Sequence, residues 1–171
     1  YISCRDYVRL IKSPQLYSFA LRHGCNILFN ALEMQKKCEE MFPGNEDKLF
    51  TAYNIIDCEK AREDAKEELD EEYKKFYDTH RVIAFSSRFV EQKCQWDILK
   101  SFELLKKDIP DAGLIFLGCR GEYENAVREM AKKSEYSNDI VFAGFQKNVF
   151  KFVSRADVFA MTSYFEGFPN V

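Results

Sequence analysis

The chain has 171 residues, enough for one domain of ordinary size, and 46% of them are hydrophobic, so it can bury a core. The formal net charge of −3 gives no electrostatic reason to expect binding to nucleic acid or to an anionic membrane surface. No apolar run approaches the roughly 18 residues of a membrane-spanning helix, and the opening YISCRDYVRLIK mixes charge into every turn, unlike a signal peptide.

The first half of the chain mixes short apolar runs with helical patterns. The expected elements are a buried strand (25–29), a helix (31–42), a turn (43–47) and a strand that runs out into a loop (48–57). Residues 58–77 are rich in charge and carry one thin apolar stripe, formed by Ala61, Ala65, Leu69 and Tyr73. This pattern predicts a single solvated amphipathic helix.

Strands and helices alternate from residue 81 onward. The expected strands are 81–87, 112–118, 139–144 and 157–163, and the expected helices are 97–108, 122–133 and 147–155. Each strand is apolar throughout, which is typical of a parallel sheet covered on both faces. We therefore predict an α/β fold with a doubly wound parallel sheet, in which ligands bind beyond the carboxyl ends of the strands.

Two cations lie in the loop after the first of these strands, SSRFVEQKC. Arg88 and Lys93 stand five residues apart at the carboxyl end of the strand. A guanidinium can fork onto two phosphate oxygens and an ammonium adds a mobile point charge, so the pair suits a diphosphate. The alternative is two solvated surface cations, since Lys and Arg are mostly exposed.

Two further loops follow strands and carry glycine. Gly118 and Gly121 allow either a close backbone approach to an anion at a helix start or simply a tight strand-to-helix turn. The last loop, FEGFPNV, carries Glu166, which can accept hydrogen bonds from sugar hydroxyls, and Gly167, which leaves room for a ligand. The alternative for Glu166 is a helix-capping acid in a turn.

The six cysteines do not point to a metal site. None stands in a C-x-x-C pair and the chain has two histidines, so we expect no bound metal. With no export signal, we expect reduced thiols in a cytoplasmic protein. Cys25 and Cys119 lie beside apolar runs and are expected to be small buried residues.

A set of short motifs occurs in a fixed order over residues 81–171. They are Arg-Phe and Gln-Lys after the first strand, Pro-Asp before the second, Gly-x-x-Gly after it, then VFAGF, ADVF and SYFEGFPNV. In this order they resemble the C-terminal domain of glycosyltransferase family 4, whose fold has two Rossmann-like domains facing across a cleft. Each motif is modest by itself, but the ordered set is specific.

The resemblance implies a fragment of a two-domain glycosyltransferase. Residues 1–53 are similar to the end of the N-terminal, acceptor-side domain with its linker, and residues 54–171 to the C-terminal, nucleotide-sugar-binding domain, truncated at its C-terminus. A second glutamate of the family's loop, which binds the nucleotide ribose, would fall beyond Val171. We therefore expect the fragment alone to be inactive.

The resemblance also implies roles for individual residues. Arg88 and Lys93 would hold the donor diphosphate and offset its charge, so that neither a metal nor a separate cofactor is required. Glu166 would contact the donor sugar and complete the catalytic set. The remaining donor contacts would come from backbone amides of Gly167, Phe168 and Asn170 at the sugar and from Phe145 and Gln146 near the base.

The implied reaction is a retaining transfer of a hexosyl group from a nucleotide-sugar donor to an acceptor hydroxyl, in polysaccharide or glycoconjugate biosynthesis. The acceptor would be a saccharide or lipid-linked, and the resemblance allows peripheral membrane association through the rest of the N-terminal domain. Two other readings remain open, a sugar-nucleotide epimerase of the same architecture and a non-catalytic nucleotide-binding α/β domain. Ser87 and Cys94 stand where the family commonly has glycine.

Overall fold

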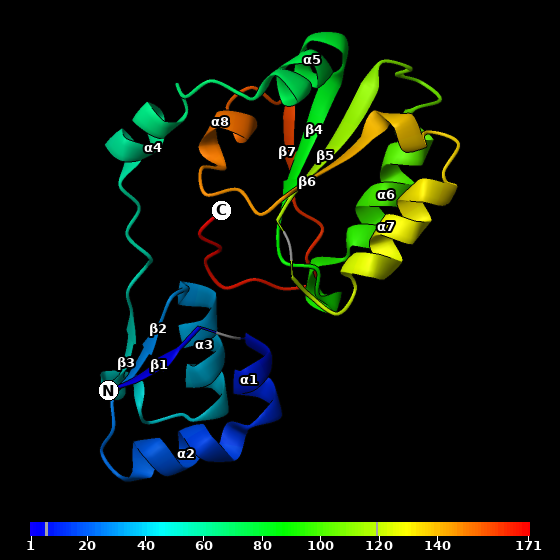
Figure 1. The fold of residues 1–171 in the computed structure, drawn as a ribbon. Helices are drawn as coiled ribbons and strands as arrows, with labels where there is room; N and C mark the ends of the chain where they lie inside the picture. Colours follow the sequence, from blue (N-terminus) through cyan, green and yellow to red (C-terminus); the bar gives the residue numbers. More distant parts are fainter. Residues whose placement is uncertain (6, 119) are drawn as a thin grey trace. The chain divides into compact units, whose positions relative to one another are not determined.

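The computed structural model describes residues 1–5, 7–118 and 120–171 (Figure 1). The chain divides into two compact units, one formed by Tyr1–Ile56 together with Phe165–Val171 and the other by Asp57–Tyr164. The division expected from the sequence, at residues 53 and 54, stays a prediction. Cys119 lies outside the described residues.

The first unit is built on a three-stranded parallel sheet. Its strands, in the order β1-β2-β3, are β1 (Ile2–Cys4), β2 (Ile27–Phe29) and β3 (Leu49–Thr51). Its helices are α1 (Tyr7–Lys12), α2 (Pro14–Arg22), α3 (Leu32–Met41) and the short 3-10 helix η1 (Glu46–Lys48). Ile27 and Phe29 of the central strand are buried against Leu10, Leu21 and Met34 from these helices.

The second unit is built on a four-stranded parallel sheet with the order β6-β5-β4-β7. The strands are β4 (Arg81–Ser86), β5 (Ala112–Leu117), β6 (Ile140–Gly144) and β7 (Val158–Ala160). The helices are α4 (Cys58–Asp64), α5 (Glu71–Thr79), α6 (Gln95–Leu105), α7 (Glu124–Lys133) and α8 (Phe150–Val153), with the 3-10 helices η2 (Glu91–Lys93) and η3 (Ser137–Asp139).

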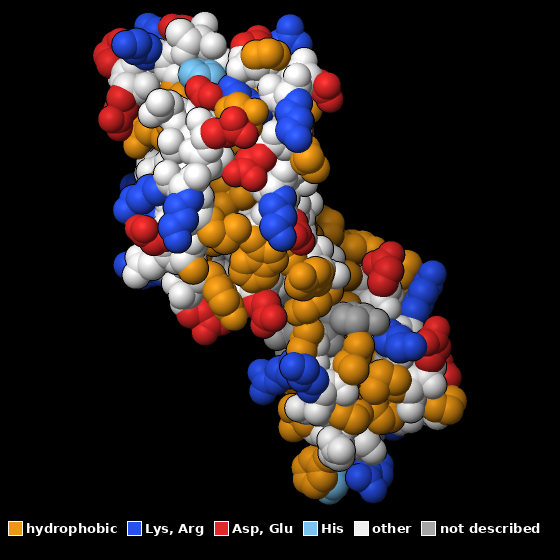
Figure 2. All heavy atoms as spheres, turned by 90° about the vertical axis from the view of Figure 1, so that its right-hand side faces the viewer, with side chains coloured by type: hydrophobic (Ala, Val, Ile, Leu, Met, Phe, Trp, Pro, Cys, Tyr) orange, Lys and Arg blue, Asp and Glu red, His pale blue; other side chains and the backbone are white. Residues whose placement is uncertain are grey.

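Helices cover both faces of this second sheet. Leu114 and Phe116 of β5 share one core with α6 and α7, whereas Ile115 and Leu117 share another with α5 and α8 (Figure 1). Every residue of β5 is buried, which explains why the strand is apolar without alternation. The predicted doubly wound, Rossmann-like α/β fold is confirmed. Figure 2 shows charges of both signs intermixed on the outer side of α6 and α7.

The strand order fixes where a ligand would bind. The chain runs outward from β4 to β5 to β6 and then returns to place β7 on the other side of β4. The direction of winding therefore reverses between β4 and β7. In open α/β sheets the crevice beyond the carboxyl ends of the strands at such a reversal is the usual ligand site.

One predicted helix is wrong. The pattern of residues 58–77 predicted one continuous helix, but the structure has α4 and α5 with a non-helical segment at 65–70 between them. Leu69 is buried in the core with Phe152 of α8, and Lys151 Nζ donates to the Glu68 carbonyl over 3.2 Å and contacts the Glu67 carboxylate at 3.3 Å. These contacts to α8 outweigh the local helical preference.

The remaining expected helices and strands are present with different limits: most are shorter, and the helix expected at 97–108 is α6, which begins two residues earlier and ends three earlier. The strands expected at 25–29 and 48–57 and the helix expected at 31–42 are β2, β3 and α3. No described helix is long and apolar enough to cross a membrane. The described cysteines form no disulfide bond with one another, and Cys25 is half-buried where full burial was expected.

Candidate functional site

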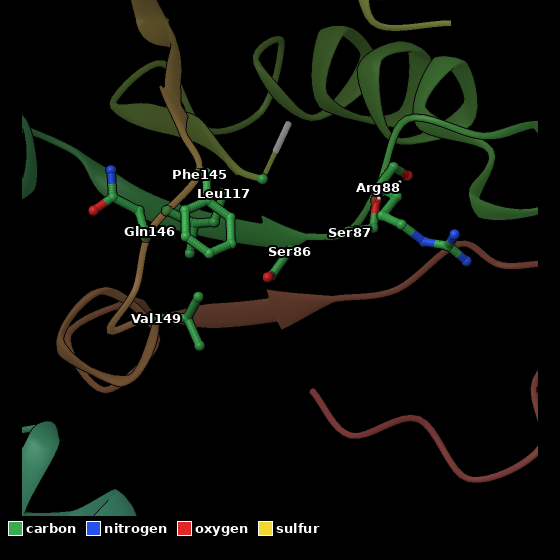
Figure 3. A pocket seen from close by; sticks show the side chains of 8 residues that line it. Ser86, Ser87, Arg88, Leu117, Phe145, Gln146 and Val149 are labelled. Atoms are coloured by element: carbon green, nitrogen blue, oxygen red, sulfur yellow. Dashed lines mark hydrogen bonds between the residues drawn. The ribbon is translucent and has the colours of Figure 1, made fainter. Parts of the chain in front are cut away.

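A pocket of about 190 Å³ opens at the carboxyl ends of β4, β5 and β6 (Figure 3). Its lining residues are Ser86, Ser87, Arg88, Leu117, Gly118, Phe145, Gln146 and Val149. Three of the residues expected to bind the donor, Arg88, Phe145 and Gln146, therefore lie around one pocket. The pocket lies at the carboxyl edge of the sheet, where ligands bind in such folds, and its lining comes from the ends of β4, β5 and β6 and the segments after them, with no described residue from the segment after β7.

Phe145 and Arg88 line different parts of the pocket, and the Arg88 guanidinium points away from the other labelled side chains (Figure 3). Phe145 and Leu117 lie beside each other in Figure 3, and the Phe145 side chain is 75% exposed. An exposed aromatic face of this kind suits stacking on a flat heterocyclic ring. Gln146 Nε2 donates to the Ala143 carbonyl over 2.6 Å, which fixes its side chain at the end of β6. Arg88 lies at the opposite end of the group of side chains that Figure 3 draws.

The backbone around Arg88 is tightly held, while its side chain is exposed. The Ser87 amide donates to the Leu117 carbonyl over 3.0 Å, extending the pairing of β4 and β5. The Phe89 amide donates to the Arg120 carbonyl, and the Phe89 carbonyl accepts from the Tyr123 amide, each over 3.2 Å. The guanidinium is therefore presented by a rigid support, which lowers the cost of ordering it on a ligand.

The two glycines of the next loop provide that support. A Cβ atom added at Gly118 would lie 2.1 Å from the Ser87 carbonyl oxygen, and one at Gly121 would lie 1.9 Å from the Phe89 carbonyl oxygen. The sequence left open an anion site or a tight turn for these glycines. The structure shows that the close backbone approach is to the neighbouring loop, which carries Arg88.

Lys93 ends the 3-10 helix η2 on the same loop, and it does not line the pocket. Cys94, which follows it, has φ 50° and ψ 48°, the left-handed conformation that glycine adopts most readily. This conformation favours glycine, which the resemblance gives as the common residue here, and it is strained for the cysteine that this chain carries. The Tyr164 amide donates to the Gln92 carbonyl over 3.0 Å, so the loop is joined to the segment after β7.

Residues 165–171 belong to the first unit and are held there by the segment before residue 56. Asn54 Nδ2 donates to the Phe168 carbonyl over 2.9 Å and to Asn170 Oδ1 over 2.6 Å. A Cβ atom added at Gly167 would lie 2.6 Å from Asn30 Oδ1, so a larger residue here would have to displace the Asn30 side chain. Glu166 lies in the same segment. The convergence of residues 166–170 with Arg88 and Lys93 on one donor sugar stays a prediction.

Two tyrosines beside the cationic loop stay protonated at neutral pH. A hydrogen bond with the Cys94 side chain raises the pKa of Tyr164. The carboxylates of Glu91 and Glu122 raise the pKa of Tyr123. Among the described residues no group of three or more His, Cys, Asp and Glu side chains could hold a metal ion.

The sequence did not single out Gln95 or Thr162, although both contact the cationic loop. Gln95 is the first residue of α6 and is fully buried. Thr162 follows β7, and its single hydroxyl donor lies within hydrogen-bonding distance of the carbonyls of both Lys93 and Cys94. For Gln95 the sequence offered one indication of a special role, a polar residue at the start of a helix with an apolar face. For Thr162 the sequence offered none.

The fold and the pocket together define a Rossmann-like α/β domain with an arginine and an exposed aromatic ring at the strand ends. Residues 66–171 match the family described as glycosyl transferases group 1. The match covers more than half of the chain, and the chain belongs to this family.

Individual relatives agree with this assignment. An uncharacterized glycosyltransferase of Methanocaldococcus jannaschii is 30% identical over 154 residues, which are 90% of this chain and 38% of that protein. A GDP-mannose-dependent monoacylated alpha-(1-6)-phosphatidylinositol monomannoside mannosyltransferase of Corynebacterium glutamicum is 33% identical over 94 residues, 54% of this chain and 24% of its own length. The chain therefore spans well under half of these curated relatives.

A solved structure shows the same fold. The crystal structure of Anabaena HepE in complex with UDP and glucose superposes with a TM-score of 0.70 over 95% of this chain and 45% of that chain, at 17% sequence identity. At this identity the likeness concerns the fold alone.

Proposed function

We propose that this chain is part of a retaining glycosyltransferase of family 4 that moves a hexosyl group from a nucleotide-sugar donor to an acceptor hydroxyl. The observation that carries the proposal is the pocket at the carboxyl ends of β4, β5 and β6, which Arg88, Phe145 and Gln146 help to line, in a chain that belongs to the group 1 glycosyl transferases. The bond from the anomeric carbon to the diphosphate oxygen would break, with its electron pair leaving on the diphosphate. A bond from the acceptor oxygen to the anomeric carbon would form, and the proton of the acceptor hydroxyl would pass to the departing diphosphate oxygen.

The proposed role of the cationic loop is to hold the donor diphosphate. The Arg88 guanidinium would fork onto two phosphate oxygens and the Lys93 ammonium would add a second positive charge. Both interactions strengthen as negative charge develops on the leaving diphosphate, which is the condition for stabilising a transition state. We therefore propose that the reaction needs neither a metal ion nor another cofactor.

The remaining proposed contacts are with the base and the sugar of the donor. Phe145 and Gln146 would lie near the base, because the exposed ring of Phe145 offers a stacking surface. Glu166 and the backbone amides of Gly167, Phe168 and Asn170 would meet the sugar hydroxyls. The acceptor would be a saccharide or a lipid-linked molecule in polysaccharide or glycoconjugate biosynthesis, and the proposal keeps the cytoplasmic location expected from the sequence.

The test uses the full-length protein that contains this chain. HepE was crystallised with UDP and glucose, and the Corynebacterium relative depends on GDP-mannose, so both UDP-sugars and GDP-sugars belong in the donor panel. We expect acceptor-dependent release of the nucleoside diphosphate from one donor and, by NMR, a product with the donor's anomeric configuration. Arg88→Lys keeps the charge but not the fork, so it should weaken donor use while folding normally.

Each other outcome of this test identifies a different function. An inverted product would contradict the retaining mechanism. Conversion of the nucleotide-sugar to its epimer without transfer would identify the epimerase. Nucleotide binding without any turnover would identify a non-catalytic binding domain.

A further inference from the structure

The loop that carries both cations, residues 87–94, is anchored at its two ends by side chains from outside it. Gln95 Nε2 contacts the end near Arg88, and Thr162 Oγ1 contacts the end near Lys93. The two anchors come from different elements, the start of α6 and the segment after β7. Each cation therefore has an anchor of its own.

Gln95 donates two hydrogen bonds to the first end of the loop. Its Nε2 lies 2.6 Å from the Arg88 carbonyl oxygen and 3.0 Å from Ser87 Oγ. The side chain is fully buried, and its Oε1 finds no hydrogen-bond partner among the residues that the structure describes. A buried amide carbonyl without a partner destabilises the fold, so core packing does not explain a glutamine here. What the residue supplies is a pair of donors that fix Arg88.

Thr162 plays the corresponding part at the second end. Its Oγ1 lies 2.9 Å from the Lys93 carbonyl oxygen and 3.0 Å from that of Cys94. The bonds join two loops on the two sides of the winding reversal. They hold the turn in which Cys94 adopts its left-handed conformation, and this turn sets where the Lys93 side chain leaves the backbone.

We propose that Gln95 and Thr162 are positioning residues for the donor diphosphate, with Gln95 setting the place of Arg88 and Thr162 that of Lys93. The inference rests on the proposed function, because it assumes that the two cations bind the diphosphate. Neither residue touches the donor. Each acts by fixing the backbone from which a cation extends, so that little ordering remains when the diphosphate binds.

The test is a pair of double-mutant cycles in the full-length protein, read out as the dissociation constants of UDP, GDP and ADP. Gln95→Met keeps the length of the side chain without its donors, and Thr162→Val keeps its shape without the hydroxyl. We expect each to weaken diphosphate binding by about tenfold, the lower end of the loss from a charge-assisted contact. Thermal melting confirms that each variant is folded.

The cycles separate positioning from a general effect on folding. On an Arg88→Ala background, Gln95→Met should change binding by less than about twofold, whereas on a Lys93→Ala background it should keep its full effect. Thr162→Val should show the reverse pattern. Thr79→Val is the matched control. Thr79, the last residue of α5, also donates through Oγ1 to a carbonyl, that of Lys75 over 2.8 Å, and its replacement should leave binding unchanged.

Two results would overturn the inference, and they differ from each other. Equal effects of Gln95→Met on all three backgrounds would assign it a purely structural role while leaving the proposed function standing. Failure of the wild-type protein to bind any of the three diphosphates would refute the proposed function, and the inference with it.

Discussion

Replacing Gly121 by alanine should displace the loop that carries Arg88, because Gly121 packs directly against that loop. The added Cβ would lie 1.9 Å from the carbonyl oxygen of Phe89 and 2.4 Å from its carbonyl carbon, well inside the roughly 3.3 Å of a close carbon–oxygen contact. Both atoms belong to the backbone, so no rotation of a side chain can relieve the overlap. The loop of residues 118–121 must move away from the loop that carries Arg88.

The magnitude follows from what this movement breaks. Gly121 has φ 152°, a conformation that alanine adopts only with strain, worth about 1–3 kcal/mol. The hydrogen bonds that Phe89 makes with Arg120 and Tyr123 would be lost, at about 1 kcal/mol each. The sum is roughly 3–5 kcal/mol, which corresponds to a fall in Tm of about 10 °C for a chain of this size.

The assay is thermal melting of Gly121→Ala beside Gly24→Ala. Gly24 also has positive φ, 75°, but an added Cβ there meets no described atom within 4 Å. The free energy of unfolding of the control should therefore fall only by the strain of the left-handed conformation, about 1–2 kcal/mol. Equal falls in Tm for the two variants would refute the view that Gly121 is needed for contact between the two loops.

Three further predictions concern single side chains. Lys93→Ala should lower kcat/KM for the donor by roughly 10- to 150-fold while stability changes by no more than about 0.5 kcal/mol, and normal kinetics with an unchanged melt would make Lys93 a solvated surface group. Burial raises the pKa of Asp139, but hydrogen bonds from Lys106 and the neighbouring imidazole outweigh it and hold the pKa below its ordinary value of 3.8. The ionised Asp139 therefore stabilises the fold fully above the unfolded-state pKa of about 4, and this stabilisation is lost as the pH falls through the lower folded-state pKa. In a plot of Tm against pH, Asp139→Asn should therefore reduce the fall in Tm at acid pH. A plot identical to that of the wild type would contradict this. Burial raises the pKa of the Cys38 thiol to about 11, so iodoacetamide near pH 8 should label the exposed Cys58 and spare Cys38 in the folded protein, and mass spectrometry showing equal labelling would contradict it.

The second unit could be predicted from the sequence because its strands are continuous apolar runs. In a parallel sheet covered on both faces every strand position is buried, as in β5, so the pattern needs no knowledge of neighbours. The first unit was less predictable. Strand β1 has three residues and exists through its pairing of Ile2 with Ile27, and neither α1 nor α2 was expected.

The break between α4 and α5 could not be predicted for a related reason. Residues 58–77 have helical spacing throughout. The contacts that replace the helix at residues 65–70 come from α8 and from residues 154–155 just after it, more than 80 positions further along the chain. Arg155 Nη1, for example, donates to the Ala65 carbonyl over 3.1 Å. Tertiary contacts of this kind outweigh helix propensity, which is worth a fraction of a kcal/mol per residue.

The candidate site was predictable where its residues form motifs. The resemblance to glycosyltransferase family 4 named Arg88, Phe145 and Gln146, and the structure places all three around one pocket. Gln95 and Thr162 were not predictable, since their importance lies in hydrogen bonds to backbone carbonyls that only the folded loops bring within reach.

The most direct test of the proposed function is a crystal structure of the full-length protein with the nucleoside diphosphate that it binds. We predict that the phosphate oxygens lie within hydrogen-bonding distance of the Arg88 guanidinium and the Lys93 ammonium, with the base beside the ring of Phe145. A diphosphate bound on another face of the sheet, or bound in the pocket without contact to either cation, would contradict the account.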